Sequence, residues 1–205
     1  VDVIRLQGET DALGYEGQAQ VRKVNTTPIR IVGNMVSITP HSNKLAYGTE
    51  YYVAIADGVF TGTSLGGTPF VGIGKAAGWT FTTRADAPSG STLTVDDDGE
   101  ADFRTVQGAL DHAMQRFAKA DPVTINIRNG RYEELLYLNG KDKVSIKGES
   151  RDGVMISYTN NETVNPGTGS SQPGTAVGTP SGGRALMLVE ASDMLSLENL
   201  SLKNT

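Results

Sequence analysis

The chain has 205 residues, no cysteine and a formal net charge of −5 at pH 7. Its length allows one large domain or two small ones, and the absence of cysteine excludes disulfides and thiol chemistry. The acidic balance argues against a nucleic-acid partner, because phosphate binding requires a basic face. We expect no membrane span, since the sequence has no window of about 18 apolar residues. The 25 glycines favour a turn-rich β protein.

Residues 1–84 contain short strand-like runs between turn signals. We expect strands at 3–6, 18–24, 29–32, 35–38, 51–55 and 79–83. Val36 and Ile38 alternate with polar residues, and this period of two is typical of half-buried antiparallel strands. The pattern predicts a small β-sandwich with Trp79 in the core between its sheets. An exposed Trp79 would instead offer a stacking surface for sugars.

Residues 85–92 form a linker by composition, because Pro, Ser, Gly and Ala cluster there. The next segment, "FRTVQGALDHAMQRFAK" at 103–119, predicts an amphipathic helix with Asp102 as its N-cap. Its apolar face consists of Phe103, Val106, Ala109, Leu110, Ala113 and Phe117. We expect this helix to cap the open end of a β-helix, since only strand patterns follow it.

The strand patterns after the helix lie at 123–127, 135–138, 144–148, 154–158, 185–189 and 195–202. Ile125 and Ile146 are one repeat apart on the roughly 20–25-residue period of solenoid coils. Residues 93–205 therefore predict the first coils of a right-handed parallel β-helix, with an antiparallel meander as the alternative. A long polar excursion at 160–183 interrupts the strands, and loops of that length are often functional.

Four segments of the second half occur in a recognisable order. The helix segment reads F-x-T-V-Q-x-A-L, and the strand segment reads G-x-Y-x-E through Gly130, Tyr132 and Glu134. "VSIKGES" and "LSLENLSLKNT" follow at 144–150 and 195–205. Together these segments resemble the start of the pectin methylesterase (pectinesterase) β-helix. In the first half, "ITPHSNKLAYGTEYYVAIADGVF" and "WTFTT" resemble a bacterial Ig-like module.

The resemblance implies a secreted bacterial carbohydrate esterase that hydrolyses methyl esters of pectin in plant cell walls, without cofactor or metal. In that family one aspartate attacks the ester, a second acts as acid and base, and glutamines stabilise the oxyanion. The motifs that carry these groups, Gln-Asp, Asp-Phe-x-Phe-Gly and Gly-Arg-Pro-Trp, do not occur in this sequence. We assign no catalytic residue here and expect an inactive fragment, truncated at both ends, whose nucleophile lies beyond it.

The candidate site residues are few. Tyr132 and Glu134 share one side of an extended segment, so with Gly130 we expect them to support the first coils, or alternatively to line a groove edge. Arg184 is a candidate for binding a galacturonate carboxylate, because guanidinium binds carboxylates bidentately, although a solvated arginine is the simpler interpretation. We expect the acidic run at 95–102 to be a solvated turn without metal, and His112 to lie at the surface.

Two other functions stay open at this point. The chain could belong to a non-catalytic polysaccharide-binding or surface protein, or to another β-helix enzyme such as a polysaccharide lyase. In each case the expected partner is pectin or another acidic plant polysaccharide. Unpaired strand edges would contact further coils or neighbouring chains. The fold alone does not decide among these functions.

Overall fold

The computed structural model describes residues 29–32, 35–38, 45–60, 62, 64–65, 67–159 and 185–205. Residues 45–87 form one compact unit, and the stacked strands after residue 88 belong to another. The strands expected at 3–6 and 18–24, the excursion at 160–183 and Arg184 lie outside the described residues. Among the helices that are described, none is long and apolar enough to cross a membrane.

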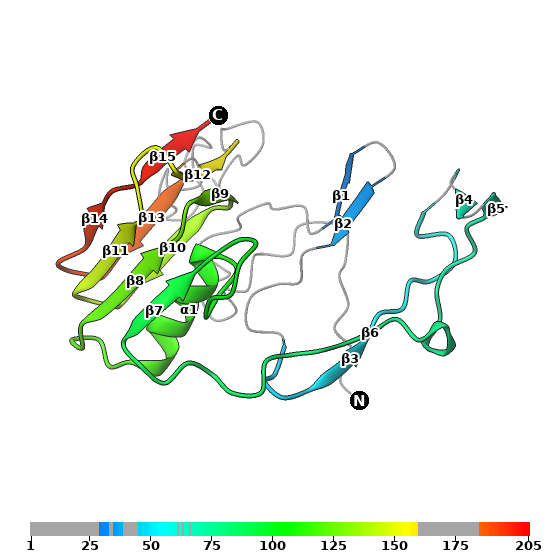
Figure 1. Ribbon diagram of the computed structural model, residues 1–205, viewed down its shortest axis with the longest axis horizontal. Helices are drawn as coiled ribbons and strands as arrows, with labels where there is room; N and C mark the ends of the chain where they lie inside the picture. The colour runs from blue at the N-terminus through cyan, green and yellow to red at the C-terminus, as the bar shows by residue number, and fades with distance from the viewer. Residues whose placement is uncertain are drawn as a thin grey trace, which may run out of the picture. The chain divides into compact units, whose positions relative to one another are not determined.

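The second half consists of coils of short parallel strands stacked beside one helix (Figure 1). Three sheets have the strand orders β7-β8-β11-β14, β9-β12-β15 and β10-β13. In chain order the elements are β7 (Thr92–Val95), α1 (Val106–Arg116), β8 (Val123–Ile127), β9 (Gly130–Glu133), β10 (Leu136–Asn139), β11 (Val144–Gly148), β12 (Val154–Tyr158), β13 (Met187–Glu190), β14 (Ser196–Glu198) and β15 (Ser201–Asn204). Every pairing among these strands is parallel, which excludes the antiparallel meander and is consistent with part of a parallel β-helix.

The pairing register confirms the expected repeat. Val123 pairs with Val144, 21 positions later, and Gly130 pairs with Val154, 24 positions later. The next coil is longer, because Ser145 pairs with Ser196, 51 positions later, and the polar excursion lies within that interval. Insertions between strands are therefore accommodated without breaking the stack, as expected for a solenoid.

The core lies inside these coils and under the helix. In β8 the inward residues Val123, Ile125 and Ile127 are at most 1% exposed, whereas the alternate residues are half-buried. Ile125 and Ile127 pair with Leu93 and Val95 of β7. Burial of each such side chain contributes about 1.5–3 kcal/mol, so the repeated apolar row is the main stabilisation of the stack.

Helix α1 begins at a different cap from the one predicted. The N-cap is Thr105, whose Oγ1 accepts a hydrogen bond of 3.1 Å from the Gly108 N–H. Asp102 instead accepts bonds of 2.9 Å from both the N–H and the hydroxyl of Thr94. The prediction of Asp102 as N-cap was wrong, because this carboxylate fastens the segment before the helix to β7.

The expectation of a surface histidine was also wrong. His112 is 6% exposed and lies between the rings of Phe103 and Phe117, with centroid distances of 5.3 and 5.9 Å. The two aromatic residues come from opposite ends of the helix segment and close over the imidazole. Burial, reinforced by the charge of Arg116, lowers the pKa of His112.

The unit at 45–87 contains β3 (Glu50–Tyr52) paired antiparallel with β6 (Thr80–Thr82), β4 (Ser64–Leu65) paired with β5 (Thr68–Pro69), and a short 3₁₀ helix, η1 (Lys75–Ala77). A separate antiparallel pair, β1 (Ile29–Val32) and β2 (Met35–Ile38), has the bounds that the sequence predicted. Trp79 is 47% exposed, so its expected core position is wrong. Since the described strands here form only two-stranded sheets, the Ig-like module stays a prediction.

Candidate functional site

The motif glutamate binds the start of the cap helix. The N–H groups of Val106 and Gln107 donate to the two carboxylate oxygens of Glu134 over 2.9 and 2.8 Å. These N–H groups have no partner within the helix, and an anion at a helix N-terminus is favoured by the helix dipole. Both oxygens of Glu134 are thus used inside the protein, 28 and 27 positions from their donors.

The environment of Glu134 favours protonation. Burial raises the pKa of its carboxyl to about 7, and the neighbouring charge of Asp111 adds to the rise. The N–H donors of Gln107 and Val106 act in the opposite direction, because they stabilise the charged form. The carboxyl therefore titrates near neutral pH in a structural position.

Gln107, also in the helix motif, joins the helix to β10. Its side-chain oxygen accepts from the Tyr137 N–H over 2.7 Å, and its side-chain nitrogen donates to the Tyr137 carbonyl over 3.1 Å. The same nitrogen donates to Asp111 Oδ1 over 2.9 Å. Gln107 is only 6% exposed. Its side-chain amide pairs both the N–H and the carbonyl of Tyr137, a residue of β10.

The remaining motif residues also face the protein. Tyr132 is 3% exposed and donates its hydroxyl to the Arg128 carbonyl over 2.9 Å. Burial, chiefly, raises the pKa of Tyr132 to about 12, so the phenol stays neutral. At Gly130 a Cβ would lie 2.3 Å from Asp97 Oδ1, and a side chain there would displace that carboxylate. This geometry favours the supporting role for Gly130, Tyr132 and Glu134 over a groove-edge role.

Three consecutive carboxylates gather at the turn before the helix. One oxygen from each of Asp96, Asp97 and Asp98 lies within 4.8 Å of the others. Asp96 Oδ1 accepts from the N–H groups of Asp98 and Gly99 over 3.2 and 2.9 Å, and the Gly99 bond chiefly lowers the pKa of Asp96. Asp97 Oδ2 accepts from the Arg131 N–H over 3.1 Å. Asp96 thus closes the turn, and Asp97 joins the turn to β9.

The role of Arg184 stays a prediction, because the residue lies outside the described part of the chain. The sequence did not predict the hydrogen bonds between the Gln107 side chain and the Tyr137 backbone. Its only signal was a polar residue inside an apolar helical face, three positions before Leu110. The role of Glu134 was anticipated only as a general support. Its exact partners are two N–H groups at the start of the helix, 28 and 27 positions away in the sequence.

No family profile and no curated protein matches the chain. Solved structures that it resembles include a pectin methylesterase variant in complex with hexasaccharide IV, at 23% identity and a TM-score of 0.40, covering 55% of this chain and 30% of that one. Pectin methylesterase in complex with hexasaccharide VII resembles it at 24% and 0.34, covering 51% and 29%. Pectin methylesterase PemA from Erwinia chrysanthemi does so at 24% and 0.33, covering 47% and 26%. The chain spans less than a third of these proteins, and each likeness concerns the fold alone.

Proposed function

We propose that this chain forms the cap and first coils of a right-handed parallel β-helix in a carbohydrate esterase of the pectin methylesterase type. The helix segment and the strand segment that resemble that family also bind each other. The observation that carries the proposal is the pair of hydrogen bonds from the Val106 and Gln107 N–H groups to Glu134. Because Glu134 binds the N-terminus of the helix, the helix segment and the strand segment have a physical reason to occur together.

The proposed reaction is hydrolysis of methyl esters on polygalacturonate. It needs an aspartate nucleophile, a second carboxyl group that donates and accepts protons, and amide donors for the oxyanion. The motifs that would supply these groups, Gln-Asp and Asp-Phe-x-Phe-Gly, do not occur in the 205 residues. In this proposal the chain supplies the capped end of the solenoid, and other coils of the same protein supply the reacting groups.

The proposed substrate also suggests where the protein works. Pectin is an extracellular polymer, so we propose a secreted protein. Its uronate carboxylates suit a guanidinium partner, for which Arg184 is the candidate in this chain. Residues 1–84 would form an Ig-like module beside the enzyme.

The test compares two proteins on methyl-esterified polygalacturonate, with methanol release as the readout. The 205-residue chain alone should release no methanol above the buffer rate. The native protein that contains the chain should release methanol, and its sequence should hold Gln-Asp and Asp-Phe-x-Phe-Gly. Activity of the 205 residues alone would contradict the proposal that other coils of the protein supply the reacting groups.

The same experiment separates the alternatives. Retention of the polymer in affinity electrophoresis without methanol release would favour a binding or surface protein. Unsaturated oligosaccharide products would favour a lyase. Either result with the native protein would overturn the esterase proposal.

A further inference from the structure

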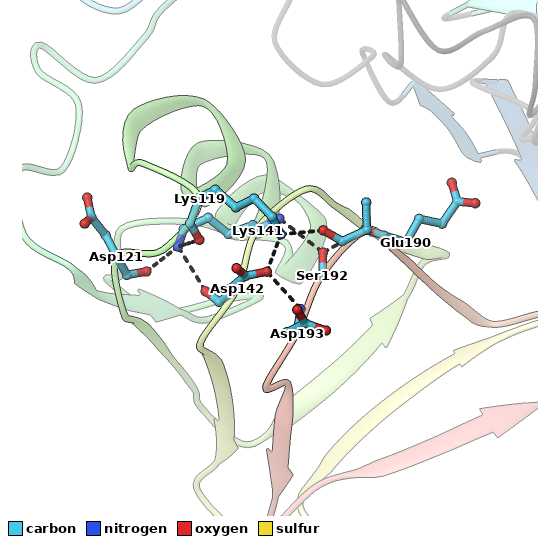
Figure 2. A network of polar contacts seen from close by, with 8 residues as sticks. Lys119, Asp121, Lys141, Asp142, Glu190, Ser192 and Asp193 are labelled. Carbon is cyan, nitrogen blue, oxygen red and sulfur yellow. Dashed lines mark hydrogen bonds and ion pairs between the residues drawn. The ribbon is translucent and has the colours of Figure 1, made fainter.

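Three turns of the solenoid lie over one another at one corner. They are the turn from α1 to β8 (117–122), the turn from β10 to β11 (140–143) and the turn from β13 to β14 (191–195). Backbone hydrogen bonds already join them: the Asp142 N–H donates to the Lys119 carbonyl over 2.8 Å, and the Lys143 N–H donates to the Asp193 carbonyl over 2.9 Å. Figure 2 shows two lysine side chains that cross between these turns.

Lys141, in the middle turn, is buried. It is 1% exposed, and its ammonium donates to the carbonyls of Lys119 at 3.2 Å, of Asp142 at 3.0 Å and of Asp121 (Figure 2). A lysine ammonium has three N–H donors, and here each has a backbone acceptor. We call these three oxygens the carbonyl site.

Further hydrogen bonds fix the turn that carries Lys141 and one oxygen of the carbonyl site. The backbone N–H of Lys141 donates to Ser192 Oγ over 3.1 Å, and that hydroxyl donates to the Glu190 carbonyl over 2.8 Å. These bonds fix the turn that carries Lys141, and the Asp142 N–H bond of 2.8 Å fixes the Lys119 carbonyl independently of the Lys141 side chain. Removal of the ammonium would take a donor from the carbonyls of Asp121 and Asp142, while the Lys119 carbonyl would keep its bond from the Asp142 N–H.

Lys119 runs in the other direction and offers a contrast. Its side chain is 52% exposed, and its ammonium binds Asp142 Oδ1 and the Ala191 carbonyl. Asp142 Oδ1 also accepts from the Asp193 N–H over 2.9 Å. An exposed ion pair of this kind contributes little, whereas loss of the Lys141 ammonium would take a donor from three carbonyls at once.

Burial lowers the pKa of Lys141, while the nearby charges of Asp121 and Asp142 raise it. The geometry favours the charged form, since every acceptor around the ammonium among the described residues is a carbonyl oxygen. The three oxygens are uncharged, whereas divalent-cation sites usually include carboxylates. A monovalent cation that exchanges its water for carbonyl oxygens fits the same ring, as in potassium filters.

We propose that the carbonyls of Lys119, Asp121 and Asp142 form a monovalent-cation site that Lys141 fills with its own ammonium. The Lys141 ammonium thereby joins the turn at 117–122 to the turn at 140–143. With the side chain shortened, the site accepts free ammonium or potassium. The proposal does not depend on the esterase function.

The test measures the thermal unfolding of the full chain carrying Lys141→Ala, Lys141→Met or the control Lys143→Ala. Lys141→Ala and Lys141→Met should each lower the Tm by about 5–10 °C, because both remove the ammonium that the carbonyls of Lys119, Asp121 and Asp142 share. Lys143→Ala removes an exposed side chain two positions away, so its Tm should stay within about 2 °C of the wild type.

The salt dependence identifies the site. Ammonium or potassium chloride should restore at least half of the Tm loss of Lys141→Ala, and tetramethylammonium chloride at equal ionic strength should not. Lys141→Met should respond to none of them, because its methyl group and stem fill the space. Equal responses of both variants to all three salts, or a Lys141→Ala protein as stable as the control, would overturn the proposal.

A measurement on the wild type covers the case in which the variants do not fold. In protein with ¹⁵N-labelled lysine side chains, the ammonium of Lys141 should keep its proton signal at neutral pH, where exposed lysine ammoniums exchange too fast to be seen. Assignment by Lys141→Arg should remove that signal. Its absence from the wild-type spectrum would contradict an ammonium held by three carbonyls.

Discussion

The two ends of the stacked coils bury their apolar residues to very different extents. One row of partners crosses the largest sheet, from Leu93 through Ile125 and Ile146 to Leu197. The first three side chains are at most 1% exposed, whereas Leu197 is 43% exposed. The residues have similar chemistry and the same register, so the difference comes from what lies beside each strand.

At the β7 end, helix α1 packs against β7, β8 and β10 and covers the core. At the β14 and β15 end, Met194 and Leu202 are 73% and 39% exposed, and no described residue covers them. Hydrophobic stabilisation follows the apolar area removed from water, at about 25 cal/mol per Å². The capped end should therefore carry most of the stability of this unit, and the exposed row should carry little.

The comparison between the two ends is tested by shortening one buried and one exposed side chain of the row. Ile125→Ala should lower the free energy of unfolding by about 4 kcal/mol, because it leaves a cavity among fully buried neighbours. Leu197→Ala should cost less than about 1 kcal/mol, since water already reaches the side chain. Urea unfolding of the two variants beside the wild type measures both values.

Circular dichroism before unfolding should show the same strand content in both variants. The comparison would fail if Leu197→Ala were as destabilising as Ile125→Ala. That result would mean that the exposed row is covered in solution.

The regular part of the stack was the most predictable from the sequence. The strands at 123–127, 144–148 and 154–158 have the predicted bounds, and in the first two apolar and polar residues alternate. The same alternation misled at 195–202, which is two strands. Asn199 breaks the run with a φ of 51°, a left-handed conformation that asparagine tolerates better than most residues.

The polar residues of the cap were the least predictable. Gln107 and Lys141 are polar positions that a periodic pattern assigns to the surface, yet both are buried. Their partners are backbone groups of Tyr137 and of two turns, and backbone groups leave no trace in the sequence pattern. The alternation did put Tyr132 and Glu134 on one side. It could not identify the helix N-terminus as the partner of Glu134.

Because Glu134 titrates, raising the pH should reduce the stability that it contributes at the start of the helix. The folded pKa of about 7 lies above the ordinary value of 4.5, so the folded state holds the proton more tightly. The resulting stabilisation is fully present below pH 4.5 and is lost as the pH rises through 7. Relative to Glu134→Gln, which does not titrate, the wild type should lose about 3 kcal/mol of stability between pH 4 and pH 8.

Unfolding free energies of both proteins at each pH give this difference directly. His112 has the opposite sign: its lowered pKa means that its contribution is present above pH 6.5 and lost as the pH falls below it. Because His112 is the same in both proteins, its effect cancels in the difference. A difference that does not change with pH would show that the carboxyl keeps its ordinary pKa of 4.5 in the folded protein.

The smallest expected effect separates the cap's hydrogen bonds from its apolar contacts. Gln107→Ala should cost about 2 kcal/mol, because the N–H and carbonyl of Tyr137 lose their partners beneath the helix. Gln115→Ala, on the exposed side of the same helix, makes the same change in side chain and helix propensity and should stay within about 0.5 kcal/mol of the wild type. Hydrogen exchange adds a local readout, since the Tyr137 amide should lose protection in Gln107→Ala while the Ile125 amide keeps it. Equal stability of the two variants, with the Tyr137 amide still protected, would mean that water replaces the glutamine and that the cap is held by its apolar face alone.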